Sequence, residues 1–187
     1  MHFITGTAET LSSEMNQQLG QYRHKVFIEH LGWQLDTPEG IERDQFDTHR
    51  AVYVVSKDGE GQINGCARLL PTTEPYLLAD VFPELLNGLE PPSREDVWEL
   101  SRFAAVDFED RPTSKPGQFS SKTAVELLFA CVRCAREQGA KRLLTVSPLG
   151  VERLLRRTGL KSHRAGPPMV IDGYPLFACW INLEDDD

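Results

Sequence analysis

The chain has 187 residues, 40% of them hydrophobic, and a formal net charge of −8. This length and composition predict a single folded domain over residues 1–187 and exclude a disordered tail protein. The acidic balance argues against a nucleic-acid binder, and no apolar run is long enough to span a membrane. The amino terminus lacks a basic, apolar leader, so we expect a cytoplasmic protein that binds neither nucleic acid nor a membrane.

Four scattered cysteines are too few for a disulfide framework in a chain of this length, which fits a reducing compartment. Cys131 and Cys134 have the spacing of a metal or redox pair, but their flanking pattern is helical and no second pair accompanies them. We therefore interpret the cysteines as core thiols. The histidines show no ligand spacing, so no metal site is expected.

Charge is unevenly distributed along the chain. Residues 133–164 contain nine basic residues and two acids, a local charge of +7, so the remainder carries −15. Such a stretch is either a solvated helix face or a docking site for an acidic partner.

The first third of the chain predicts a strand, a helix and a loop. A strand is expected at residues 1–6, followed by a helix from an N-cap at Thr7 to about Gly32, because apolar residues recur there every three or four positions. Residues 33–50 are polar and irregular and predict a long loop, which in a compact domain is usually functional or mobile.

The middle of the chain predicts an antiparallel hairpin and a central strand. The β-rich runs 51–56 and 63–70 flank a turn-forming segment, and residues 77–86 can form short helical turns. The run 97–106 then predicts a central strand.

The last third predicts a helix at 120–138, a strand at 142–146, a helix at 151–157 and a final strand at 173–183. Antiparallel pairs early and a strand-helix-strand crossover later favour an α/β fold. We expect a three-layer sandwich around a mixed sheet.

The densest polar cluster is the run Glu-Arg-Asp-Gln-Phe-Asp at 42–47, which follows the aromatic residues Phe27 and Trp33. Carboxylates and aromatic faces attract a sulfonium or an ammonium, and an arginine such as Arg23 can clamp a carboxylate. The cluster therefore suits a zwitterionic ligand with an extra positive centre. The alternative, core aromatics beside a solvated acidic loop, fits the spacing equally well.

A second cluster, Trp-Glu-Leu-Ser-Arg-Phe at 98–103, lies on the predicted central strand. Strict alternation would place Glu99, Ser101 and Phe103 on one face and Arg102 on the other. Buried charges are costly unless they are paired or functional, and the alternative is a structural ion pair with the acidic loop. Glu99 and Arg102 can serve one site only if a β-bulge redirects one of them.

Together with Cys-Ala-Arg-Leu-Leu-Pro at 66–71, these motifs resemble the acyl-homoserine lactone synthases, the bacterial quorum-sensing autoinducer synthases. The match covers nearly the whole chain, and eight positions fit the family pattern: Arg23, Phe27, Trp33, Asp44, Asp47, Arg68, Glu99 and Arg102. The resemblance implies a fold like that of the GCN5-related N-acetyltransferases, a twisted mixed sheet wrapped by helices and splayed into a V.

The resemblance also implies the reaction. An acyl thioester acylates the α-amine of S-adenosylmethionine, and the product cyclises and releases methylthioadenosine. No cofactor is expected, since S-adenosylmethionine is a substrate. The implied catalytic residues are Glu99 as general base, Arg102 and Ser101, with backbone amides near Arg102 as oxyanion donors. The residues assigned to S-adenosylmethionine are Arg23, Phe27, Trp33, Asp44, Asp47, Arg68, Arg102 and Phe103.

Family members mostly use acyl-acyl carrier protein, and a minority use acyl-coenzyme A. Residues 107–121 contain only Gly117, so the glycine-rich turn that binds the coenzyme A pyrophosphate in related acetyltransferases is missing. Acyl carrier proteins are acidic, so Arg153, Arg156 and Arg157 are the expected docking residues. The alternatives are a coenzyme A-dependent N-acyltransferase and a non-catalytic binding module, which would leave the charged central strand without a purpose.

The acyl chain is expected to enter between the central strand and the strand at 142–146. The expected lining residues are Leu128, Leu143, Leu144, Thr145, Val146 and Ser147. Narrowing by Leu128, Leu144 and Val146 predicts a medium-length, unsubstituted chain such as octanoyl. Thr145 either binds a 3-oxo group, as a threonine does in family members that make 3-oxo products, or merely satisfies β-propensity.

Overall fold

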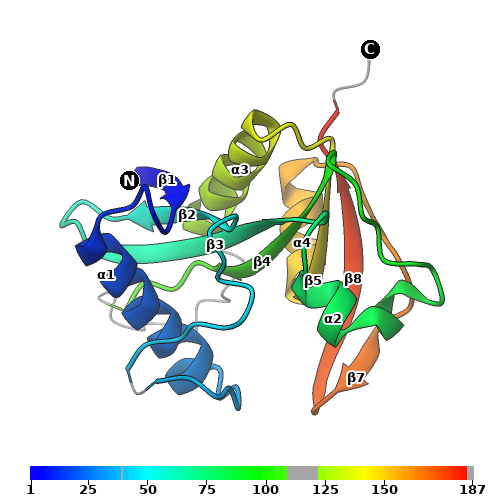
Figure 1. Cartoon of the computed structure of the whole chain (residues 1–187), viewed down its shortest axis with the longest axis horizontal. Coiled ribbons are helices and arrows are strands. Elements are labelled where there is room, and N and C mark those ends of the chain that lie inside the picture. The colour runs from blue at the N-terminus through cyan, green and yellow to red at the C-terminus, as the bar shows by residue number, and fades with distance from the viewer. Residues whose placement is uncertain (39, 109–121, 185–187) are drawn as a thin grey trace.

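The computed structural model describes residues 1–38, 40–108 and 122–184. Within these ranges, eight strands form one mixed sheet that carries helices on both faces (Figure 1). In chain order the elements are β1 (His2–Thr7), α1 (Ser13–Arg23), the π-helix η1 (His24–His30), β2 (Val52–Lys57), β3 (Ile63–Pro71), α2 (Leu77–Val81), the 3-10 helix η2 (Pro83–Leu86), β4 (Val97–Ala104), α3 (Lys122–Glu137), β5 (Arg142–Pro148), α4 (Gly150–Thr158), β6 (Ser162–Arg164), β7 (Met169–Ile171) and β8 (Tyr174–Asn182). The predicted α/β sandwich is confirmed.

The strands follow the order β1-β2-β3-β4-β5-β8-β6, and β7 pairs with β8. Neighbouring strands are antiparallel except β4 and β5, which are parallel and are joined by a crossover through α3. Parallel neighbours require a crossover of this kind, usually through a helix. The predicted β2–β3 hairpin and the predicted crossover are both confirmed.

The central strands are buried on both faces, which explains their nearly continuous apolar sequence. On β2, Val52 and Val54 belong to the core under α3 and α4, whereas Tyr53 and Val55 belong to the core under α1. The elements η1, α2 and η2 contribute to the same core as α1. The two faces of the sheet therefore have separate cores.

β4 and β5 stay paired over only a short distance and then separate. Their register runs from Val97 opposite Arg142 to Leu100 opposite Thr145. Beyond this point β4 continues with β3 and β5 continues with β8, and the two halves of the sheet diverge (Figure 1). The expected V-shaped splay is present.

The first helix differs from the prediction at both ends. Thr7 belongs to β1, and the N-cap is Ser12, whose Oγ accepts a hydrogen bond from the amide of Met15 at 3.1 Å. The α-helix ends at Arg23, and the chain continues as the π-helix η1. Apolar periodicity could not locate this change, because the same face remains buried through Val26.

The strands β6 and β7 were not predicted. Each has three mostly exposed residues, too few for an alternating pattern. β7 turns into β8 through Asp172 and Gly173, both with positive φ, as a tight hairpin turn requires.

Candidate functional site

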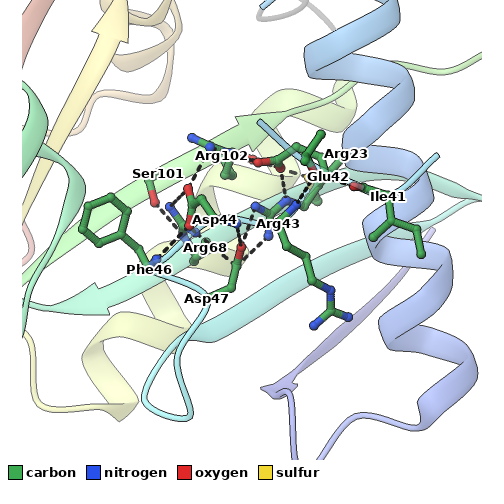
Figure 2. A network of polar contacts seen from close by, with 12 residues as sticks. Arg23, Ile41, Glu42, Arg43, Asp44, Phe46, Asp47, Arg68, Ser101 and Arg102 are labelled. Carbon is green, nitrogen blue, oxygen red and sulfur yellow. Dashed lines mark hydrogen bonds and ion pairs between the residues drawn. The ribbon is translucent and has the colours of Figure 1, made fainter. Parts of the chain in front are cut away.

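A network of three arginines and three carboxylates lies on the α1 face of the sheet (Figure 2). The arginines come from α1, β3 and β4, whereas all the carboxylates come from the loop before β2. Its members are Arg23, Arg68, Arg102, Glu42, Asp44 and Asp47. The charges balance, and the ion pairs with Arg68 and Arg102 connect the carboxylates of this loop to two central strands.

Asp44 bridges two of the arginines. Arg68 donates to its two oxygens at 2.5 and 3.2 Å, and Arg102 donates from Nη2 at 2.7 Å. The Asp44 side chain is 15% exposed, compared with 3% for Asp47 and 0% for Glu42. Asp44 is therefore the carboxylate of this network that most directly faces solvent.

Asp47 is held from several sides inside the network. Arg23 donates to both of its oxygens at 2.7 and 2.9 Å, and the hydroxyl of Tyr53 donates at 2.9 Å. Burial opposes ionisation of Asp47, but Arg23 and Arg68 outweigh it and hold the pKa of this carboxyl well below its usual value. The geometry is that of a structural ion pair, the alternative that the sequence left open.

Glu42 was not among the residues assigned to the site. Its carboxylate is fully buried and accepts from Arg23 Nε at 2.6 Å and from Arg102 Nη2 at 3.0 Å. The loop docks closely against α1 at this point. A Cβ added to Gly20 would lie 2.7 Å from Ile41 Cγ2, and the Glu42 amide donates to the Gly20 carbonyl at 3.0 Å. Its place two residues before Asp44 was the only signal in the sequence.

A β-bulge brings the residues of β4 to this face. Arg68 pairs with Ser101 but Cys66 pairs with Ala104, so β4 has one extra residue, and Arg102 has a φ of 51°. Ser101 and Arg102 consequently point to the same side, where Ser101 Oγ accepts from Arg68 Nε at 3.1 Å. The β-bulge that is needed for Glu99 and Arg102 to serve one site is therefore present.

Phe103 does not join the other residues assigned to S-adenosylmethionine. The bulge turns its side chain to the opposite face, where it packs against the core under α3. The bulge interrupts the alternation that placed Phe103 on one face with Ser101, and the assignment of Phe103 to this ligand stays a prediction.

The two aromatic residues form a stacked pair beside Arg102. Phe27 and Trp33 have ring centroids 4.8 Å apart, and the guanidinium carbon of Arg102 lies 5.5 and 5.6 Å from these centroids. The Trp33 amide donates to the Phe27 carbonyl at 2.9 Å, just beyond the π-helix. Phe27 is buried in the core and also faces the charged network, so its place as a core residue is confirmed and its contact with a cationic ligand stays a prediction.

Glu99 lies on β4 and is fully buried against the first turn of α2, near the arginines of the network. Its carboxylate accepts hydrogen bonds from the amides of Leu78 at 2.7 Å and Leu77 at 3.1 Å. Burial raises the pKa of Glu99 to about 7, although these amides and the positive charges of Arg68 and Arg102 oppose the rise. A carboxyl with this pKa can exchange a proton near neutral pH.

The six residues assigned to the acyl pocket lie on both faces of the sheet. Leu128 and Leu143 belong to the core under α3, whereas Leu144 and Val146 face the core under α1. Leu128 therefore cannot narrow the same side of a passage as Leu144 and Val146. Thr145 and Ser147 are buried, and their hydroxyl oxygens lie 2.8 Å apart where β4 and β5 separate.

The expected docking residues lie on the outer side of α4. Arg153, Arg156 and Arg157 are exposed, and Arg156 pairs with Glu152 at 3.7 Å. The segment that lacks the glycine-rich turn lies largely outside the described residues, because residues 109–121 are not among them.

The cysteines and the apolar character of the helices bear on the remaining expectations. All four cysteines are free and buried. No helix in the described ranges has the length and apolar character needed to cross a membrane.

A family model described as autoinducer synthase matches residues 7–187. The acyl-homoserine-lactone synthase of Acinetobacter nosocomialis is 52% identical over 183 residues, which cover 98% of this chain and 100% of the relative. The chain belongs to the autoinducer synthase family. It is an acyltransferase of the acyl-homoserine-lactone synthase class, as the resemblance implied.

Solved structures agree with this family assignment. TofI, in a ternary complex with an inhibitor and MTA, is 44% identical with a TM-score of 0.85, covering 98% of this chain and 92% of that one. BjaI, described as a coenzyme A-dependent acyl-homoserine lactone synthase, is 25% identical with a TM-score of 0.83, covering 98% and 82%. A putative N-acetyltransferase from Lactobacillus plantarum, 20% identical with a TM-score of 0.65 and coverage of 98% of both chains, shows the shared fold alone.

Proposed function

We propose that this autoinducer synthase transfers an acyl group from acyl-acyl carrier protein to the amine of S-adenosylmethionine, and that the product closes to a lactone. The observation that carries the proposal is the charge balance of the site. Three arginines face three network carboxylates, and Glu99 adds a fourth acid once it ionises near pH 7. S-adenosylmethionine has one net positive charge, which balances the one surplus negative charge of the site.

Each part of S-adenosylmethionine has a partner in this site. Asp44 is the exposed carboxylate for the ammonium, and the stacked rings of Phe27 and Trp33 suit the sulfonium. Arg102, beside both, is the arginine best placed for the substrate carboxylate. MTA in the complex of the relative TofI supports a ligand of this class.

The remaining network residues support these contacts. Arg23, Arg68 and Asp47 are almost fully buried and paired, so we assign them to holding Asp44 and Arg102 in place. Ser101 accepts from Arg68 and is therefore a positioning residue, although the resemblance placed it among the catalytic ones.

Glu99 is the proposed general base. It takes a proton from the substrate ammonium, directly or through water, and the free amine attacks the thioester carbonyl carbon. Backbone amides at the bulge near Arg102 stabilise the oxyanion. As the intermediate collapses and its C–S bond breaks, the second proton of the attacking nitrogen passes to the departing sulfur, so the carrier leaves as a thiol. The substrate carboxylate then attacks the carbon that bears the sulfonium, which releases methylthioadenosine and closes the lactone.

Acyl carrier protein is the proposed donor because α4 presents exposed arginines to an acidic partner. Coenzyme A remains the alternative, since BjaI is a coenzyme A-dependent relative. The carrier protein partner and the reduced cysteines both fit the proposed cytoplasmic location.

A medium-length acyl chain, such as octanoyl, belongs to the same proposal. We propose that the acyl chain enters where β4 and β5 stop pairing, beyond Leu100 and Thr145. Leu143 and Leu144, which are buried on opposite faces of the sheet there, are the residues proposed to limit its length.

The test compares donors with the purified enzyme. We expect kcat/KM for octanoyl-acyl carrier protein to exceed that for octanoyl-coenzyme A, with a maximum at medium chain lengths. A preference for the coenzyme A thioester would overturn the donor assignment, and equal rates with all chain lengths would overturn the medium-chain assignment.

A further inference from the structure

Glu42 is the most deeply buried acid of the network and contacts two arginines from different elements. It accepts from Arg23 on α1 at 2.6 Å, and from Arg102 on β4 at 3.3 Å from Nε and 3.0 Å from Nη2. Burial opposes its ionisation, but both arginines outweigh this and hold the pKa of Glu42 below its ordinary value. Glu42 is therefore a fixed negative charge that links α1 to the bulge of β4.

Arg102 needs such a support because its backbone is in an unfavourable conformation. A φ of 51° is uncommon for a residue with a side chain, so other contacts must hold this conformation. The Arg102 carbonyl accepts from Cys66 Sγ at 3.4 Å, and its guanidinium is held by Glu42 and Asp44. These contacts fix the guanidinium beside the rings of Phe27 and Trp33.

We propose that Glu42 is a positioning residue for the amino-acid part of the substrate. By holding Nε and Nη2 of Arg102, it directs the third guanidinium nitrogen, Nη1, toward the substrate carboxylate. This inference rests on the proposed function, since it assumes that S-adenosylmethionine is bound at this site.

A second effect of Glu42 is to keep Asp44 available. Without Glu42, Asp44 is the remaining carboxylate that bonds Arg102, and a guanidinium favours a two-pronged contact with one carboxylate. Arg102 would then turn toward Asp44 and neutralise the group that faces solvent. Loss of Glu42 would thus weaken both the carboxylate and the ammonium contacts of the ligand.

Glu42→Gln is the main variant because it keeps the size of the side chain and removes the charge. We expect the dissociation constant for S-adenosylmethionine, measured by calorimetry, to rise at least about tenfold. Methylthioadenosine lacks the amino and carboxylate groups, so its dissociation constant should stay within about twofold of wild type. A variant damaged only in folding would lose affinity for both ligands or bind both normally at a reduced active fraction.

A double-mutant cycle tests whether Glu42 acts through Arg102. Arg102→Lys removes the two-pronged contact, and Glu42→Gln added to it should weaken S-adenosylmethionine binding by less than about twofold. Glu14→Gln, at an exposed acid on α1, is the matched control and should bind both ligands like wild type. The inference would be overturned if the losses of affinity from Glu42→Gln and Arg102→Lys multiply in the double variant, or if Glu42→Gln alone leaves the affinity unchanged.

Two safeguards keep the test decisive. If Glu42→Gln does not fold, Gly20→Ala displaces Ile41 and the adjoining Glu42 without removing a charge, and should give the same selective loss. Normal S-adenosylmethionine binding by a folded Gly20→Ala would then overturn the inference. A wild-type protein that binds neither ligand would contradict the proposed function itself.

Discussion

Among single residues, Glu99 carries the proton-transfer step of the proposed reaction. Glu99→Gln keeps the shape and removes the base, so turnover should fall by about two to four powers of ten, a larger loss than that in S-adenosylmethionine affinity. In wild type, turnover should rise with pH through about 7, because the base must be deprotonated. Steady-state rates across pH check both points. Near-normal turnover in the variant would give the base role to water or another carboxylate.

The same residue makes stability depend on pH. The pKa of Glu99 is raised from 4.5 to about 7 in the folded protein, so the folded state binds the proton more tightly than the unfolded chain. The free energy of unfolding should therefore decrease as pH rises from 4.5 to 7, by about 3 kcal/mol from this group. Denaturant unfolding at pH 4.5 and 8 should show that Glu99→Gln removes this decrease. An unchanged pH dependence would contradict the raised pKa.

Asp44 and Asp47 should respond differently to loss of charge. Asp47→Asn leaves buried Arg23 without its two-pronged partner and should destabilise the fold by about 3–5 kcal/mol. Asp44→Asn removes the more exposed carboxylate and should mainly weaken S-adenosylmethionine binding. Calorimetry and denaturant unfolding of both variants separate the effects. Normal stability with weaker binding in Asp47→Asn would instead assign Asp47 to the ligand.

Sequence reasoning identified most of the charged site but not its internal pairing. Residue types and spacing pointed to Arg102 and the 42–47 loop, but which acid meets which arginine depends on the docking of Ile41 against Gly20. Glu42 was omitted because its pairing depends on how the loop docks, a tertiary feature that a pattern of residues does not encode. The bulge places Phe103 on the opposite face from Ser101, whereas strict alternation places both on one face.

Among the elements, α4 is the proposed contact for the carrier protein. Charge reversal at Arg153 and Arg156 should raise KM for acyl-acyl carrier protein and flatten its salt dependence, because electrostatic attraction to an acidic partner is lost. KM for S-adenosylmethionine should not change. Lys57→Glu, at the carboxyl end of β2, is the control for charge reversal and should leave both KM values unaltered. An effect on stability alone, or none, would contradict docking at α4.

The predictable elements were those with long periodic patterns. α3 and the β2–β3 hairpin follow the expected ranges closely, whereas the change from α1 to the π-helix η1 leaves the buried face unaltered and cannot be seen in a pattern of apolar residues. The same limit applies to β6 and β7, which exist because β8 offers them a partner and not because their residues alternate.

For the whole molecule, the sheet splays into a V where β4 and β5 stop pairing (Figure 1). The α/β class followed from the order of strands and helices, but the splay is set by where pairing stops, after Leu100 and Thr145. In the proposed reaction, S-adenosylmethionine binds on the α1 face and the acyl thioester approaches where the two halves of the sheet diverge.

The most direct test of the account is the stoichiometry of products from the purified protein with S-adenosylmethionine and octanoyl-acyl carrier protein. Mass spectrometry and chromatography should find acyl-homoserine lactone, methylthioadenosine and free carrier thiol in equal amounts. Accumulation of an acylated amine with thiol but without methylthioadenosine would contradict the account and indicate a simple N-acyltransferase.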